Sequence, residues 1–217
     1  GDPVRAGLLA NLRGDDRIRL TALAAAITAL EKQLPNLPTT GVPQPVMNDL
    51  RGSLPTGPGA YPTRPVKNIT RVIVHHTATR GDITPQRLAE AQVQQGKPGT
   101  TYHFLINDNG TIHWMQPLEI ATTQTNRVDA NSSGVAVALA GNFTTAVPGD
   151  AQLTAAAQVV AWLLGQAGLK TTDVVGRREL ENVASPGATW LGWASFRRSS
   201  RERIESVVMP RWDKASR

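Results

Sequence analysis

The stretch from Arg71 to His76 reads RVIVHH, and its run of β-branched residues is typical of a buried strand. Residues 101–107 and 111–115 predict two further strands. The turn Asp108-Asn109-Gly110 between them is a strong hairpin signal. Other strands are predicted over residues 134–139 and 173–175.

Helix signals alternate with these strands. Thr84 supplies a capping hydroxyl and Pro85 suits the first helical position, so a helix is predicted from there to about Gln95. An apolar run over residues 152–166 predicts a long helix, and residues 190–208 predict a closing one. Strands interleaved with helices, together with one hairpin, predict an α/β fold with a central mixed β-sheet flanked by helices.

The first part of the chain has a different pattern. Between residues 16 and 34, leucines and one isoleucine recur in steps of three and four, as in a heptad seam. This short seam predicts either a single amphipathic helix or a short coiled coil that sets an oligomer. Residues 35–65 hold eight prolines and predict an extended arm. We therefore predict an N-terminal helix with the start of the linker (1–40), and a main domain with its proline-rich arm (41–217).

Composition narrows the classes of function. No stretch approaches the roughly 18 apolar residues that cross a bilayer, so no membrane span is predicted. The N-terminus does not determine localisation, because it shows no basic-then-apolar signal pattern. The absence of cysteine excludes disulfides and thiolate zinc ligands. The net charge of +6 favours the binding of polyanions. Nucleic acid is not a predicted partner, because the basic residues are not accompanied by a series of aromatic side chains on which bases could stack.

Four segments occur in the order and spacing of a known family. They read VIVHHTAT (72–79), TYHFLINDNGTI (101–112), GVAVALAGNF (134–143) and VVGRRELENVASPG (174–187). Together they resemble the type 2 N-acetylmuramoyl-L-alanine amidases and the peptidoglycan recognition proteins that share their fold. The resemblance covers roughly Val46 to the C-terminus.

The resemblance implies a zinc site that this chain has not kept. The family cleaves the amide between muramic acid and the first peptide residue, using zinc held by two histidines and a cysteine. The matching positions here are His75, Arg177 and Ser185. A guanidinium has no lone pair for a metal, and a neutral hydroxyl is a poor zinc ligand. We therefore predict no bound zinc or other cofactor, with His75 as a remnant ligand.

The resemblance also implies a ligand-binding groove. Tyr102 matches a tyrosine beside the metal and would be catalytic only in an active enzyme. Gln124 is the nearest match to a groove-wall position that precedes Asn131. The predicted groove residues are His75, Tyr102, Gln124, Asn131, Arg177 and Ser185.

Two interpretations of Arg177 stay open. Its charge would lie where the family holds zinc, suited to a bidentate bond with a peptide-stem carboxylate. Alternatively, it is a surface arginine paired with Glu179 or Glu181.

Three hypotheses about function follow. The first is a non-catalytic module that binds peptidoglycan or its muropeptide fragments, outside the cell or in the envelope, phage tails included. The second is an active amidase with a relocated metal or a metal-free site, in which Ser185 is the nucleophile and His75 the base. The third is the structural tip of an oligomeric phage-tail or cell-surface assembly, joined through the N-terminal helix.

Overall fold

The computed structural model describes residues 42–187 of the chain. The predicted N-terminal helix, the boundary at residue 41 and the predicted closing helix lie outside them. The described part contains a sheet whose strands are β1 (Asn48–Asp49), β2 (Arg71–His76), β3 (Phe104–Ile106), β4 (Ile112–Trp114), β5 (Gly134–Leu139) and β6 (Val174–Gly176).

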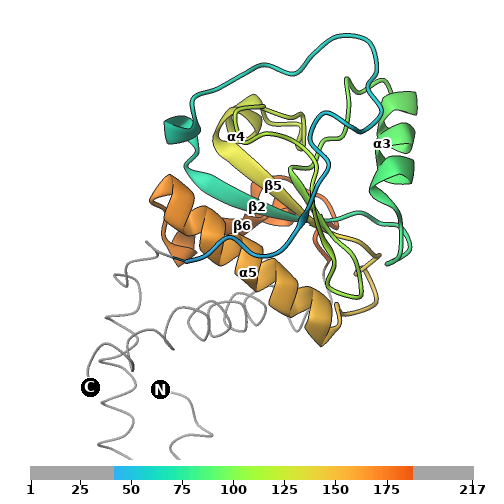
Figure 1. Cartoon of the computed structure of the whole chain (residues 1–217), viewed down its shortest axis with the longest axis vertical. Helices are drawn as coiled ribbons and strands as arrows, with labels where there is room; N and C mark the ends of the chain where they lie inside the picture. The colour runs from blue at the N-terminus through green and yellow to red at the C-terminus, as the bar shows by residue number, and fades with distance from the viewer. Residues whose placement is uncertain (1–41, 188–217) are drawn as a thin grey trace, which may run out of the picture. The chain divides into compact units, whose positions relative to one another are not determined.

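The six strands form one sheet in the order β1-β4-β3-β5-β2-β6, of which Figure 1 labels the neighbours β5, β2 and β6 next to helix α5 (Asp150–Ala167). Only β3 and β4 pair antiparallel, whereas the other neighbours pair parallel. This confirms the predicted mixed sheet flanked by helices. The helices are α3 (Pro85–Gln94), α4 (Val128–Ser133), α5 (Asp150–Ala167) and α6 (Arg177–Leu180), with 3-10 turns at Val66–Asn68 and Thr171–Asp173.

Local signals set the ends of the two longest helices. The Thr84 side chain accepts the N–H of Arg87 and Pro85 follows it, so α3 begins where a cap and a proline predict. Helix α5 ends at Gly168, whose φ of 65° is a left-handed conformation that glycine adopts without strain. Both helices therefore confirm the sequence prediction to within two residues at each end.

The hairpin strands, Phe104–Ile106 and Ile112–Trp114, are shorter than predicted, and side chains bind the backbone just before β3. The N–H of Thr101 donates to the side-chain oxygen of Gln92 at 3.0 Å, and the Gln92 amide donates back to the Thr101 hydroxyl. Ladder pairing with β4 starts at Phe104, next to a backbone bond from the N–H of Met115 to the carbonyl of His103 at 2.7 Å.

The two faces of the sheet carry side chains of different size. In β5, the valines and leucine pack with α5 in the main core, while Ala136 and Ala138 face a smaller cluster on the opposite side. Alternation along a strand sends successive side chains to opposite faces. Small alanines leave room for larger rings from neighbouring segments, and Tyr102 belongs to that smaller cluster.

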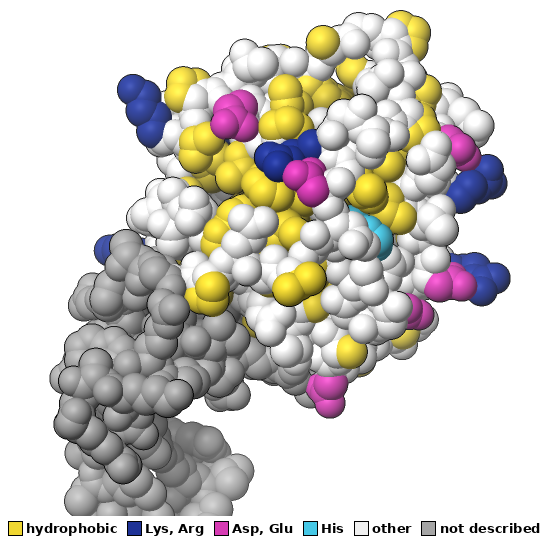
Figure 2. Space-filling view, in the orientation of Figure 1, with side chains coloured by type: hydrophobic (Ala, Val, Ile, Leu, Met, Phe, Trp, Pro, Cys, Tyr) yellow, Lys and Arg dark blue, Asp and Glu magenta, His cyan; other side chains and the backbone are white. Residues whose placement is uncertain are grey.

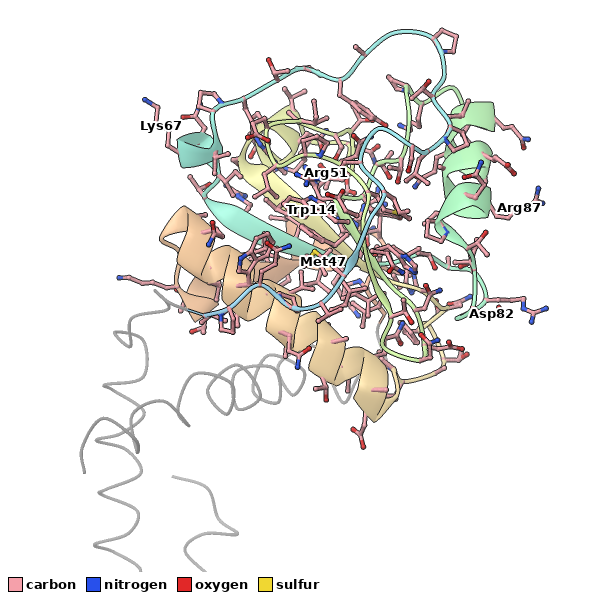
Figure 3. The ribbon with its side chains drawn as sticks, viewed as in Figure 1. Met47, Arg51, Lys67, Asp82, Arg87 and Trp114 are labelled. Atoms are coloured by element: carbon pink, nitrogen blue, oxygen red, sulfur yellow. The ribbon has the colours of Figure 1, made fainter. Side chains whose placement is uncertain are left out.

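The proline-rich segment is bonded to the sheet edge and its loops. Backbone hydrogen bonds join Leu50 to Trp114 and Arg64 to Glu119. The Arg51 guanidinium lies 3.7 Å from the ring centre of Trp114, and the two are labelled side by side in Figure 3. Residues 50–64 therefore pack as part of the domain.

On the surface, several arginines are paired with acidic neighbours. Dark blue and magenta side chains stand next to one another on the face shown in Figure 2. Arg80 and Asp82 form one such pair, and Arg87 and Glu90 another. Between residues 42 and 187 there is no helix with the length and apolarity that crossing a membrane requires.

Candidate functional site

The candidate site lies where β2 and β6 end side by side. Gly176, the last residue of β6, pairs with Val74 of β2, so the chain leaves the sheet at Arg177 next to His75. Ser185 returns to the same place, because its Oγ accepts the N–H of His76 at 3.1 Å. The three positions that match the family's zinc ligands therefore converge on the end of β2.

His75 is fully buried, and its protonation can be assigned from its neighbours. The Gln124 amide nitrogen donates to the carbonyl of Gly134 at 2.8 Å, which turns its oxygen toward His75. His75 Nε2 lies 2.9 Å from that oxygen and must carry the proton that it donates. The other nitrogen, Nδ1, therefore has a lone pair, and it is buried without a partner among the described residues.

Burial also determines the charge of His75. It lowers the pKa of the imidazole to about 3, and the nearby charge of Arg177 adds to this. His75 is therefore neutral at physiological pH and offers a hydrogen-bond or metal-ligand lone pair.

Tyr102 packs against the imidazole of His75. The two ring centres are 5.2 Å apart and the rings are tilted by 54°. Burial raises the pKa of Tyr102, so its hydroxyl keeps its proton at neutral pH and can donate. No hydrogen bond joins this hydroxyl to another described residue.

Arg177 forms an ion pair with Glu181, four residues later. The arginine Nε donates to one carboxylate oxygen, and the backbone N–H of Asn126 donates to the other at 3.1 Å. Burial acts to raise the pKa of Glu181, but these hydrogen bonds outweigh it and lower the pKa. The pair is mostly shielded, since the side chains are 24% and 10% exposed.

This geometry bears on both interpretations of Arg177. The arginine is paired with Glu181, while Glu179 accepts the N–H of Gly176 at 2.7 Å. The two terminal nitrogens of Arg177 make no hydrogen bond to residues 42–187. Arg177 is therefore partly buried and oriented by Glu181, with donors left over for a ligand.

Asn131 has a different place from the other predicted groove residues. Its side-chain oxygen accepts both the N–H and the hydroxyl of Thr125, and its amide donates to the carbonyl of Thr125. Asn131 thereby holds the loop that carries Gln124 and Asn126. The structure brings His75, Tyr102, Gln124 and Arg177 together, with Asn131 behind the loop.

Two residues of the site are missing from the predicted groove. Glu181 was indicated only as an ion-pair partner, although the i, i+4 spacing from Arg177 is a usable signal. Asn126 contributes a backbone N–H, and because nearly every residue type has one, the sequence gives no signal for it.

The residues present do not fit a zinc ion. Arg177 is a cation without a lone pair, and the Ser185 hydroxyl already accepts the N–H of His76. Of these three positions, only His75 offers a suitable nitrogen, whereas a catalytic zinc needs three protein ligands. Within residues 42–187 no group of three or more His, Cys, Asp or Glu side chains could hold a metal.

The other histidines have protein partners. His76 Nδ1 accepts the N–H of Phe143 at 3.1 Å. His113 contacts Asn107 at 2.8 Å and Asn48 at 3.3 Å. His103 is bonded at both nitrogens, to the N–H of Ala136 and the carbonyl of Ile120.

Comparison with known proteins gives a consistent result. The model of a family described as N-acetylmuramoyl-L-alanine amidase matches residues 65–190. Among curated proteins, no match is found.

Several solved structures share the fold. An endolysin amidase from Clostridium intestinale is 23% identical with a TM-score of 0.55, over 68% of this chain and 90% of that one. Drosophila peptidoglycan recognition protein SD is 20% identical with a TM-score of 0.57, over 68% and 97%. A third match, over 68% and 98%, is a complex of recognition proteins LCa and LCx with tracheal cytotoxin (22%, TM-score 0.56).

Proposed function

This chain belongs to the N-acetylmuramoyl-L-alanine amidase family, and on that premise we propose that it binds peptidoglycan without cleaving it. The observation that carries the proposal is the Arg177–Glu181 ion pair at the position of the second zinc ligand. A protein cation paired with a carboxylate leaves neither the ligands nor the charge balance that a zinc ion needs. The bound state is therefore metal-free.

The structural neighbours support this class of partner. They include recognition proteins named for peptidoglycan, and one is a complex with tracheal cytotoxin. We infer that this chain binds peptidoglycan or its muropeptide fragments, and that it acts where the polymer is, outside the cell or in its envelope.

The side chains at the end of β2 are suited to hold an acyl or carboxylate group. Arg177 has two terminal nitrogens available, and the Tyr102 hydroxyl is a further donor near them. Glu181 orients the guanidinium before a ligand arrives, which reduces the entropy lost on binding. Hydrogen bonds from a guanidinium to a carboxylate are about twice as strong as neutral ones. A carboxylate of the peptide stem is the group that this arrangement favours.

The same geometry argues against the metal-free amidase. A general base must take a proton from the nucleophile, and the pKa of His75, lowered to about 3, makes it a weak base. The group that orients His75 is the neutral amide of Gln124, which cannot stabilise an imidazolium as a carboxylate would. The Ser185 hydroxyl, the nucleophile of that hypothesis, contacts the backbone of His76.

The test is binding of the purified full chain to sacculi and soluble muropeptides, for the parent and for Arg177→Ala. We expect roughly 10- to 100-fold weaker binding in the variant, because one charge-assisted bond pair is lost. Arg87→Ala is a matched control, since Arg87 also pairs with a glutamate on a helix but lies away from the site. Equal binding by Arg177→Ala and the parent would contradict the proposed contact.

The same samples test the enzyme hypothesis. If the parent releases soluble peptides from sacculi and His75→Ala does not, the chain is an active amidase. We expect no release from either protein.

We also propose the division into residues 1–40 and 41–217 and an oligomer joined through the N-terminal helix, which lies outside the described residues. Light scattering of the full chain tests the oligomer, and a monomer would contradict it.

A further inference from the structure

We propose that the site at the end of β2 binds one particular chemical group, an N-acylated amino acid whose α-carboxylate is free. In this arrangement His75 Nδ1 accepts the amide N–H of that residue, and the Arg177 guanidinium binds its carboxylate. The inference rests on the proposed function and narrows the part of a muropeptide that the site would contact. The two contacts depend on different side chains, so they can be tested separately.

His75 Nδ1 can only accept a hydrogen bond. The ring proton is on Nε2, 2.9 Å from the side-chain oxygen of Gln124, and a neutral imidazole has one donor and one acceptor nitrogen. Nδ1 is buried without a partner among residues 42–187. Few buried polar atoms in native proteins lack a partner, and one that does calls for an explanation. A ligand atom with only lone pairs would be repelled there, so the ligand must present an N–H or O–H group.

Two other histidines show which donor suits a buried Nδ1 in this fold. His76 Nδ1 accepts the N–H of Phe143 at 3.1 Å, and His103 Nδ1 accepts the N–H of Ala136 at 3.0 Å. Both donors are backbone amides. A peptide N–H of the ligand would complete the hydrogen bonds of His75 in the same way.

Arg177 supplies the donors for the carboxylate. Its Nε donates to Glu181, and its two terminal nitrogens make no hydrogen bond to residues 42–187. The N–H of Asn126 holds the other Glu181 oxygen at 3.1 Å, so the arginine is oriented before a ligand arrives. The hydroxyl of Tyr102, whose ring centre is 5.2 Å from that of His75, is a further donor. A group with a negatively charged oxygen and an N–H therefore matches both the donors and the acceptor of the site.

The two contacts are close enough to engage a single residue of a ligand. Val74 pairs with Gly176 across the sheet, and His75 and Arg177 are the residues that follow them. Neighbouring strands lie about 4.8 Å apart. In an amino acid the nitrogen is about 2.5 Å from the carboxyl carbon, because both are bonded to the α-carbon. An N–H and a carboxylate on the same α-carbon therefore fit the spacing of the two side chains.

Binding requires a local movement, because Nδ1 is buried in the ligand-free chain. The Arg177 side chain is 24% exposed, and it is bonded to described residues only through Nε. We expect its guanidinium to turn toward the ligand carboxylate and to open the path to Nδ1.

Only some residues of a peptide carry the required group. An ordinary internal residue has its α-carboxyl group in a peptide bond, whereas the last residue of a chain keeps this group free. A residue that is joined to the next one through its side-chain carboxyl group keeps it free as well. Both sources present the same chemistry to the site, so the experiment has one series of probes for each.

The first series represents the chain end. N-acetyl-D-alanyl-D-alanine is compared with its ester analogue N-acetyl-D-alanyl-D-lactate, in which an oxygen replaces the N–H, by NMR titration of the purified full chain. We expect the ester to bind roughly 10- to 100-fold more weakly, because a buried acceptor would then face another lone pair. The C-terminal amide of the first probe should bind roughly tenfold more weakly, since the guanidinium loses a charged acceptor.

The second series represents the internal source. Its parent probe is N-acetyl-L-alanyl-D-glutamate with the side-chain carboxyl group blocked as a methylamide, and its analogue has an ester in place of the amide between the two residues. The series that binds more tightly identifies the source, and the loss on replacing the amide by the ester is expected in that series. These comparisons use the unchanged protein, so they do not depend on the folding of any variant.

Protein variants assign each contact to its side chain. In His75→Leu the amide and the ester should bind equally, and in Arg177→Ala the free acid and the C-terminal amide should bind equally. His113→Leu is the matched control, because His113 Nδ1 lies 3.3 Å from the side-chain nitrogen of Asn48 and belongs to β4. This control should keep both preferences.

Three outcomes would overturn the inference. The first is equal binding of amide and ester by the parent in both series. The second is a preference for the amide that survives in a folded His75→Leu variant. The third is binding of sacculi by the parent without binding of any probe. All three leave the proposed wall binding intact, whereas a parent that binds neither sacculi nor muropeptides would overturn the proposed function itself.

Discussion

Two regions of this molecule each contain a fully buried histidine close to an arginine, and they differ in whether the polar groups are satisfied. Around His103, both ring nitrogens are bonded to the backbone. Around His75, one nitrogen is bonded and the other has no partner among the described residues. Burial lowers the pKa of both histidines to about 3, so the pKa does not distinguish them. The difference lies in the hydrogen bonds.

The arginines differ in the same way. Arg64 is buried, and its guanidinium donates to two backbone carbonyls, of Leu118 at 3.2 Å and Asn131 at 2.9 Å. Burial lowers its pKa to about 10, which still leaves it charged at neutral pH. Arg177 is paired with a carboxylate and keeps terminal donors unused within the described residues. A pair whose bonds are complete stabilises the fold, whereas a pair with unused donors and acceptors is available to a ligand.

Acidification should produce the largest effect, since it acts on both regions together. The unfolded histidines bind a proton below about 6.5, while the folded ones stay neutral until about pH 3. Stability is therefore lost as the pH falls through this window. From pH 7 to 5 we expect a loss of about 4 kcal/mol for the two histidines together. Urea unfolding at several pH values measures it, and replacing either histidine by leucine should roughly halve the slope.

Replacing the two histidines one at a time should separate the regions at constant pH. His103→Leu leaves the N–H of Ala136 and the carbonyl of Ile120 unpaired, which should cost roughly 3 kcal/mol of unfolding free energy. His75→Leu leaves one buried acceptor unpaired, the side-chain oxygen of Gln124, and removes an unpaired buried nitrogen, so its cost should be about 1 kcal/mol. Equal losses in urea unfolding would remove the distinction drawn here.

Arginine-to-lysine replacements should have opposite consequences in the two regions. Arg64→Lys keeps the charge but loses the planar fork, and should cost about 2 kcal/mol of stability without weakening binding to sacculi. Arg177→Lys should cost no more than about 1 kcal/mol of stability and weaken sacculus binding roughly tenfold. If Arg64→Lys is the variant that loses binding, the assignment of roles is wrong.

The smallest effect is expected where the arginine of an ion pair is itself exposed. Arg87 pairs with Glu90 on α3, and its side chain is 76% exposed. Arg87→Ala should change the unfolding free energy by no more than about 0.5 kcal/mol and leave binding unchanged. A larger loss would mean that exposed ion pairs contribute more to the stability of this fold than is expected of solvent-screened charges.

Much of the fold could be predicted from local residue patterns. Strands β2 and β5 occupy the predicted ranges, because a continuous apolar run bounded by polar residues or glycine is a clear signal of a buried strand. Strand β1 and the helices α4 and α6 were not predicted. Strand β1 is two residues long, and α4 has a sequence, VDANSS, without an apolar periodicity. Both depend on neighbours that are distant along the chain.

The sequence by itself determined which residue types stand at the three zinc positions, and hence that Arg177 and Ser185 cannot act as the family's ligands do. That conclusion follows from the chemistry of a guanidinium and a hydroxyl and needs no coordinates. Only the tertiary structure decided which nitrogen of His75 carries the proton, that Glu181 rather than Glu179 pairs with Arg177, and that a backbone N–H holds Glu181 in place. Hydrogen bonds are short and directional, so they depend on where distant segments meet and not on the order of residues along the chain.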